Sequence, residues 1–68
     1  MLTLVDLRKR AKRTQEDVAR SCNVTQGAVS HWEAGRGAPL RKYYRYLKAA
    51  FDCTDEELSE AIRETLGG

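Results

Sequence analysis

Four closely spaced residues have types that suit recognition of nucleic-acid bases: Gln26, Gly27, Ser30 and His31. The Gln26 amide can donate and accept together, as N6 and N7 of adenine require, and a His31 ring nitrogen can donate to or accept from a base edge. Ser30 can bond to a base or a phosphate, while Gly27 permits close approach without a side-chain contact. These types and spacings make the four residues candidate base readers if they share an exposed face.

The stretch before them predicts a short amphipathic helix. Thr14 suits the N-cap, Asp17 stands where its carboxylate can reach back to the Thr14 amide, and Glu16 adds negative charge at the positive end of the helix dipole. Asn23 ends this helix because asparagine tolerates the left-handed conformation better than most residues. Its apolar face consists of Val18, Ala19 and Cys22.

A second short helix, capped by Thr25, carries the four candidates. Val24, which precedes this helix, is expected in the core. The buried stripe of the helix consists of Ala28, Val29 and Trp32. The candidate base readers therefore remain outside the core on the opposite face. Residues 15–33 together predict two helices hinged at a tight turn.

Two further helices are expected on either side of this pair. One starts after Thr3, with Asp6 in a capping arrangement, and buries Leu4, Leu7 and Ala11. After a loop indicated by glycine and proline at residues 35–39, the other begins at Leu40. Its inward stripe is Tyr44, Leu47 and Phe51, with Tyr43 and Tyr46 left near the surface beside basic residues. Such interleaving also suits base stacking on single strands, but the core needs one face of this helix.

A last helix is expected from Thr54, its N-cap, to Gly67, with Glu57 at the capping-box position. Its apolar face consists of Leu58, Ala61, Ile62 and either Thr65 or Leu66. A chain of 68 residues hides only about 60% of its unfolded surface, so its core is marginal alone and dimerisation would help. This apolar edge is either core cover or a dimer seam, and we expect Leu58, Ile62 and Leu66 to meet a second subunit at least in part.

Charge is distributed unevenly along the chain. Residues 1–48 hold eleven Lys and Arg against four Asp and Glu, a net charge of +7, whereas residues 49–68 hold one against six, a net charge of −5. A basic region around the candidate base readers favours a polyanionic partner, and the acidic end should point away from it. No apolar run reaches the length of a signal-peptide core or membrane span, which predicts a cytoplasmic protein.

Catalysis and metal binding are poorly supported. The single histidine, His31, has no nucleophile or carboxylate partner by spacing, and no glycine-rich phosphate loop follows a strand. Cys22 and Cys53 lack CxxC spacing and lie at apolar-pattern positions, which favours buried thiols over a disulfide or metal site. We therefore expect neither an enzyme nor a protein that holds a metal or cofactor.

Residues 14–35 resemble the DNA-binding domain of the phage repressor and Cro family and of small bacterial XRE-type regulators. Gln15 matches at the start of the first helix of the pair, Ala19 at the helix crossing, and Ser30-x-Trp32-Glu33-x-Gly35 as a run, with apolar matches at Val18, Cys22, Val24, Val29 and Trp32. The resemblance extends over residues 4–58. Asn23 stands where the family usually has glycine, and Lys12-Arg13 where it usually has Gly-Leu, so local differences are expected there.

The resemblance implies an all-α, compact five-helix repressor-like helix-turn-helix domain, which we take as a single domain over residues 1–68. It implies a structural ion pair between Arg8 and Glu33. Inserted in the major groove, the second helix of the pair would present Gln26, Gly27, Ser30 and His31 to bases. The phosphate-binding set is expected to be Gln15, Thr25, Arg36, Arg41 and Lys42.

Two function classes remain. The first is a transcriptional regulator, expected to be a repressor in the manner of Cro, that reads a near-palindromic operator on double-stranded DNA as a homodimer, with half-sites about 34 Å apart. The second is a protein-interaction module such as an antitoxin, for which the acidic last helix would be the natural surface. Controller proteins of restriction systems share the same build. The expected setting is the cytoplasm of a bacterial or phage-infected cell.

Overall fold

The computed structural model describes residues 2–67. These residues form α1 (Leu4–Arg10), α2 (Gln15–Cys22), α3 (Gln26–Glu33), the 3₁₀ turn η1 (Arg41–Tyr43), α4 (Tyr44–Phe51) and α5 (Asp55–Gly67). No strand occurs within residues 2–67. The predicted all-α, five-helix fold class is therefore confirmed.

Local chemistry sets the beginning of most helices. In a capping box, a threonine hydroxyl accepts from the amide three residues later, and the carboxylate there accepts from the threonine amide. Three helices begin this way: α1 with Thr3 and Asp6, α2 with Thr14 and Asp17, and α5 with Thr54 and Glu57. The Thr25 hydroxyl caps α3 by accepting from the Ala28 amide at 3.1 Å. All four predicted N-caps are confirmed.

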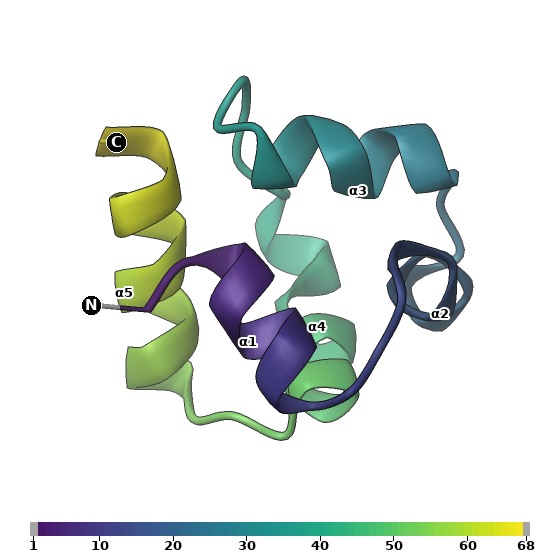
Figure 1. Ribbon diagram of the computed structural model, residues 1–68, viewed down its shortest axis with the longest axis horizontal. Helices are drawn as coiled ribbons and strands as arrows, with labels where there is room; N and C mark the ends of the chain where they lie inside the picture. The colour runs from purple at the N-terminus through teal and green to yellow at the C-terminus, as the bar shows by residue number, and fades with distance from the viewer. Residues whose placement is uncertain (1, 68) are drawn as a thin grey trace.

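The predicted turn between α2 and α3 is also confirmed. Asn23 adopts the left-handed conformation with φ 56° and ψ 45° and ends α2. This turns the chain so that Thr25 can start α3 two residues later. Figure 1 shows the result, with α3 crossing one edge of the molecule and the N-terminal end of α3 beside α2.

One core joins all five helices. Buried hydrophobic side chains come from α1 (Leu4 and Leu7), α2 (Val18, Ala19 and Cys22), α3 (Val29 and Trp32), α4 (Leu47, Ala50 and Phe51) and α5 (Leu58, Ala61 and Ile62). The inward faces predicted for α2 and α3 are thus confirmed in outline. Val24, Ala28 and Tyr44 are only partly buried and pack against this core, and Ala11 is half-buried at the C-cap of α1.

The segment after the loop differs from the prediction. The α-helix begins at Tyr44, after the short η1 turn, and neither Leu40 before η1 nor Tyr43 before α4 supplies a side-chain cap. Tyr43 is half-buried instead of lying at the surface, and its ring centroid is 5.5 Å from that of Trp32. Tilted aromatic pairs at this distance stabilise a core. Tyr43 therefore belongs to the core, whereas Tyr46 is exposed as predicted.

Two of the three residues expected at least in part at a dimer seam on α5 are buried within the single chain, which is the core-cover alternative. Leu58 and Ile62 expose only 1% and 7% of their surface within the single chain, because α5 packs against α1 and α4. They are core residues and have no surface left for a second subunit. Leu66, one turn beyond Ile62, is 46% exposed.

Candidate nucleic-acid interface

The two faces of α3 have different surroundings. Val29 and Trp32 point into the core, while Gln26, Gly27, Ser30 and His31 are exposed. Their side of α3 is not covered by another helix, and α5 lies at the far flank of the molecule from α2 (Figure 1). The structure thus brings the four predicted base readers together on one accessible helix face.

Part of this face is hollowed. The hollow is lined by Gly27, Ser30, His31, Ala34 and Arg36. Three of these residues are predicted base readers, and Arg36 is a predicted phosphate contact, so the structure places a cation at the edge of the reading face. The resemblance implied phosphate contacts from the backbone near Ala34 to Arg36, whereas the Ala34 side chain was not among the predicted base readers.

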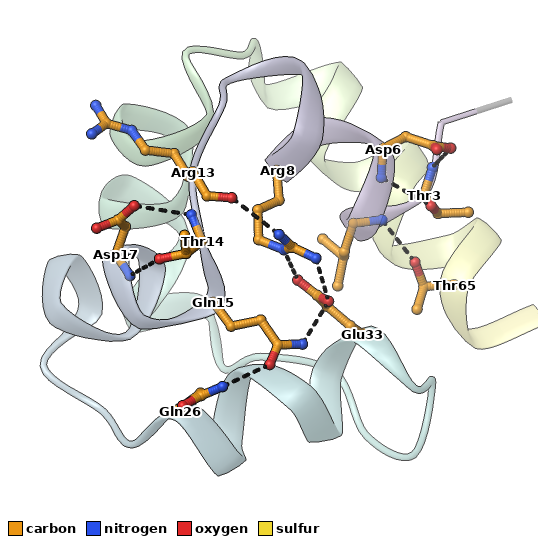
Figure 2. A network of polar contacts seen from close by, with 11 residues as sticks. Thr3, Asp6, Arg8, Arg13, Thr14, Gln15, Asp17, Gln26, Glu33 and Thr65 are labelled. Atoms are coloured by element: carbon orange, nitrogen blue, oxygen red, sulfur yellow. Dashed lines mark hydrogen bonds and ion pairs between the residues drawn. The ribbon is translucent and has the colours of Figure 1, made fainter.

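A chain of hydrogen bonds leads from α1 to Gln26 (Figure 2). Arg8 Nε donates to Glu33 Oε2 at 2.6 Å, and Arg8 Nη2 donates to Glu33 Oε1 at 3.4 Å. Gln15 Nε2 donates to the same Oε1 at 2.9 Å, and Gln26 Nε2 donates to Gln15 Oε1 at 3.2 Å. The ion pair between Arg8 and Glu33 is therefore present and connects α1, α2 and α3.

These hydrogen bonds limit the phosphate-binding role that the sequence predicted for the Gln15 side chain. The sequence placed Gln15 among the phosphate contacts, but its amide oxygen and one amide hydrogen bond within the protein. An amide nitrogen has two hydrogens, so one remains for an outside acceptor. Gln26 likewise keeps its amide oxygen and a second hydrogen, the pair that adenine requires. The orientation of both amides is linked to the Glu33 carboxylate, a link that sequence reasoning missed because it passes through Gln15 of α2 while Gln26 and Glu33 belong to α3.

Two glycines hold the loop after α3 close to its surroundings. Gly35 has φ +75°, and a Cβ there would lie 2.5 Å from the Thr65 carbonyl oxygen of α5. A Cβ at Gly37 would lie 2.8 Å from His31 Nε2. The His31 ring therefore lies against Gly37, and α5 lies against Gly35. The contact at Gly35 is with backbone and holds the chain before Arg36, whereas the contact at Gly37 is with the exposed His31 ring.

The other predicted phosphate contacts lie apart from the hollow. Arg41 and Lys42 are exposed in η1, and the Lys42 ammonium is 5.2 Å from the centroid of the Tyr43 ring. Thr25 is exposed at the N-terminus of α3. A second hollow lies between the end of α2 and η1, lined by Ser21, Cys22, Asn23, Lys42, Tyr43 and Tyr46.

Ion pairs neutralise part of the basic region on the side of α5. Arg10 of α1 donates two hydrogen bonds to Glu57 at 2.9 and 3.1 Å. The Arg10 guanidinium and the Thr54 amide lower the pKa of Glu57 from 4.5 to about 2. Lys48 pairs with Asp55 at 2.7 Å. The cations predicted to bind phosphate, Arg36, Arg41 and Lys42, belong to none of the ion pairs found within residues 2–67.

Other site types find little support in the described part of the chain. Cys22 and Cys53 are free thiols, as predicted, and burial raises the pKa of both. No group of His, Cys, Asp and Glu within residues 2–67 has the arrangement of a metal site. None of the helices in this part is both long and apolar enough to cross a membrane.

Comparison with known proteins agrees with this geometry. A family model described as a helix-turn-helix domain matches residues 2–61. The chain belongs to the helix-turn-helix domain family. In this helix-turn-helix protein, α2 and α3 are the paired helices, and membership indicates a DNA-binding regulator. Neither a search of curated proteins nor a search of solved structures gave a match.

Proposed function

We propose that this protein is a sequence-specific transcriptional regulator of the phage repressor and Cro (XRE) type, and that it acts as a repressor. The observation that carries the proposal is the outer face of α3, where Gln26, Gly27, Ser30 and His31 are exposed while the opposite face is fixed in the core. A helix held in this way can enter the major groove of double-stranded DNA, where each base pair has a distinct pattern of donors and acceptors.

The four residues on this face are proposed to contact base edges. Gln26 is the leading candidate, because the hydrogen bond to Gln15 restrains its amide before DNA arrives. A restrained side chain loses less conformational entropy on binding. Gln26 would then recognise adenine through its amide oxygen and its second amide hydrogen. His31 would read a neighbouring base through the part of the ring directed away from Gly37.

A second group of residues is proposed to position the protein on the DNA backbone. It consists of Gln15, Thr25, Arg36, Arg41 and Lys42. Contacts to phosphate fix orientation and add affinity without distinguishing sequences. Arg8 and Glu33 are assigned a structural role, since each side chain is mostly buried and satisfied by the other.

We further propose that residues 1–68 act as one domain and bind DNA as a homodimer in the cytoplasm of a bacterial or phage-infected cell. Two identical subunits would read half-sites about 34 Å apart, which makes the operator a near-palindrome. Repression would follow from occlusion of the promoter. No catalytic residue, metal or cofactor enters this proposal.

Selection from a random-sequence duplex library, followed by mobility-shift measurement, tests the proposal. We expect one enriched motif with near-palindromic halves. An antitoxin or another protein-interaction module would enrich no motif, and that result would overturn the proposal.

Four alanine variants test the assignment of roles on the selected duplex and on a scrambled duplex. Gln26→Ala and His31→Ala should each cost about 1 to 3 kcal/mol on the selected duplex and change little on the scrambled one. Arg36→Ala and Arg41→Ala should weaken binding to both, and each should reduce the slope of log affinity against log salt by about 1. If the first two variants behave like the arginine variants or have no effect, α3 is not the reading helix.

A further inference from the structure

Thr65, in the last turn of α5, contacts two other elements through two different atoms. Its hydroxyl oxygen accepts a hydrogen bond from the Leu4 amide at 3.0 Å, and Figure 2 shows this bond at the start of α1. Its carbonyl oxygen lies against Gly35, where an added Cβ would be 2.5 Å from that oxygen and 3.4 Å from the carbonyl carbon. Thr65 therefore connects the first residue of α1 with the loop after α3.

Both contacts involve groups that a helix leaves without partners of its own. The first four amides and the last four carbonyls of an α-helix have no partner within that helix. Leu4 begins α1, and Thr65 lies two residues before the end of α5. The Thr65 hydroxyl thus satisfies an amide of α1, and the same bond holds a helix end that would otherwise fray.

Gly35 passes this restraint to Arg36. The Arg36 amide donates to the His31 carbonyl at 3.3 Å, so the chain leaves α3 through Gly35 and Arg36. The Gly35 backbone, with φ +75°, sets where the Arg36 side chain begins. Arg36 lines the hollow on the outer face of α3 and belongs to none of the ion pairs found within residues 2–67. A shift of the Thr65 carbonyl therefore reaches a cation on the proposed DNA-binding side.

We propose that Thr65 is a positioning residue for the phosphate contact of Arg36. The bond from the Leu4 amide to the Thr65 hydroxyl keeps the last turn of α5 in place. The Thr65 carbonyl then holds Gly35, and with it the start of Arg36. Thr65 itself touches no DNA. This inference rests on the proposed function, because it requires that Arg36 reaches a phosphate, and it gives α5 a part in DNA affinity although its carboxylates are repelled by DNA.

Three substitutions separate the hydroxyl from the rest of the side chain. Thr65→Val replaces the hydroxyl with a methyl group of similar size, so the Leu4 amide loses its acceptor. Thr65→Ser keeps the hydroxyl and loses only the methyl. Thr54→Val is the matched control, because the Thr54 hydroxyl accepts from the Glu57 amide at 3.1 Å at the opposite end of α5. It makes the same chemical change on the same helix and lowers stability by the loss of a cap.

Affinity for the selected and scrambled duplexes is measured at several salt concentrations, under conditions where circular dichroism shows each variant to be folded. Thr65→Val should weaken binding to both duplexes. It should also reduce the slope of log affinity against log salt by up to about 1, the reduction expected for Arg36→Ala. Thr65→Ser should restore the original affinity and slope, and Thr54→Val should leave both unchanged. If Thr65→Val does not fold, Thr65→Ala removes the same hydroxyl, favours the helix, and carries the same expectations.

A double-mutant cycle shows whether Thr65 acts through Arg36. In a protein that already carries Arg36→Ala, Thr65→Val should have no further effect on affinity or slope, because the contact that Thr65 positions is gone. In a protein that carries Arg41→Ala, Thr65→Val should keep its full effect. A loss of stability alone would weaken binding equally in both backgrounds.

Three outcomes would overturn the inference. If Thr65→Val binds with the original affinity and slope, the inference fails and the proposed function stands. If Thr65→Val and Thr54→Val weaken binding alike, or if Thr65→Val has the same effect with and without Arg36→Ala, the hydroxyl acts on stability alone and the inference also fails. If Arg36→Ala itself changes neither affinity nor slope, Arg36 is not a phosphate contact, and that part of the proposed function fails together with the inference.

Discussion

Gly35 and Gly37 show how single residues fix the loop after α3. Gly35 meets the Thr65 carbonyl of α5, and Gly37 meets the His31 ring, each at a distance that leaves no room for a Cβ. Arg36 stands between them, so the backbone before it is held against α5, while the backbone after it lies beside the His31 ring. If Arg36 contacts a phosphate, as proposed, this restraint reduces the conformational freedom that is lost on binding.

We expect Gly35→Ala to destabilise the fold by about 2 to 4 kcal/mol. The positive φ of 75° is strained for alanine, and the Cβ would lie 2.5 Å from a backbone oxygen that cannot rotate away. Chemical denaturation measures the loss, with Gly67→Ala as the control. Equal unfolding free energies for Gly35→Ala and the original protein would mean that α5 does not press on this loop.

At the scale of helices, Glu33 connects three elements. Its carboxylate accepts hydrogen bonds from Arg8 of α1 and Gln15 of α2, and only 7% of its side chain is exposed. Arg8 also donates to the Arg13 carbonyl at 3.0 Å, and Arg13 Nε donates to the Ala50 carbonyl at 3.3 Å. The loop between α1 and α2 is thereby attached to the C-terminal end of α4.

Glu33→Ala should lower the unfolding free energy by about 3 to 5 kcal/mol, because it leaves the buried Arg8 charge without a partner. It should also weaken binding to the selected duplex, since the Gln15 amide loses the acceptor that orients it. The control is Arg20→Ala, which removes the exposed pair with Asp17 at 2.6 Å and should cost less than about 1 kcal/mol. Urea denaturation measures both variants. Similar losses of unfolding free energy in the two variants would show that the hydrogen bonds to Glu33 stabilise the fold no more than an exposed ion pair does.

The helix starts give the protein a defined sensitivity to acid. Hydrogen bonds from the threonine caps lower the pKa of Asp6 and Asp17 from 3.8, and Arg10 with Thr54 lowers that of Glu57 from 4.5 to about 2. Each carboxylate releases its proton more readily when folded. Its stabilisation is complete above the unfolded pKa and is lost as the pH falls through the folded pKa.

Stability should therefore decline as the pH falls from about 4.5 toward about 2. Urea denaturation at a series of pH values measures this decline. Glu57→Gln should be less stable at neutral pH and should show a smaller loss across the same interval. If its curve paralleled that of the original protein, the pair between Arg10 and Glu57 would not link folding to protonation.

At the scale of the whole molecule, α5 completes the core, and among its residues Leu66 in the last turn is the large hydrophobic side chain that remains exposed. Leu58 and Ile62 are buried by α1 and α4, whereas Leu66 is exposed. The Thr65 hydroxyl accepts from the Leu4 amide at 3.0 Å, which fastens the same turn to the start of α1. Leu66 is therefore the residue of the proposed dimer seam that remains accessible on the single chain.

We expect Leu58→Glu to unfold the chain, because a carboxylate would enter a core position that is 1% exposed. Leu66→Glu should leave the helical content unchanged and, if α5 contributes to the dimer, should shift the protein toward monomer. Circular dichroism and sedimentation measure the two effects. A folded Leu58→Glu variant would contradict the placement of α5 in the core.

The sequence alone determined where α1, α2, α3 and α5 begin and which faces of α2 and α3 are apolar. Thr3, Thr14, Thr25 and Thr54 predict the helix starts, because a cap bonds to an amide only three residues away. Asn23 predicts the turn for a similarly local reason. The apolar stripes of α2 and α3 follow from the helical repeat, which also places the candidate base readers on the opposite side.

Tertiary structure decided the contacts between residues distant in the chain. An apolar stripe shows that one face of α5 must be covered, but it does not show which part of the protein covers that face. Leu58 and Ile62 were therefore expected, at least in part, at a dimer seam. Both lie in the core of the single chain. Tyr43 was predicted at the surface for the same reason, since its partner Trp32 belongs to another helix. The engagement of the Gln15 amide and the approach of Thr65 to Gly35 likewise depend on how the helices pack. Local propensity specifies a helix and its faces, whereas the residues that each face contacts are fixed only when all the helices pack around one small core.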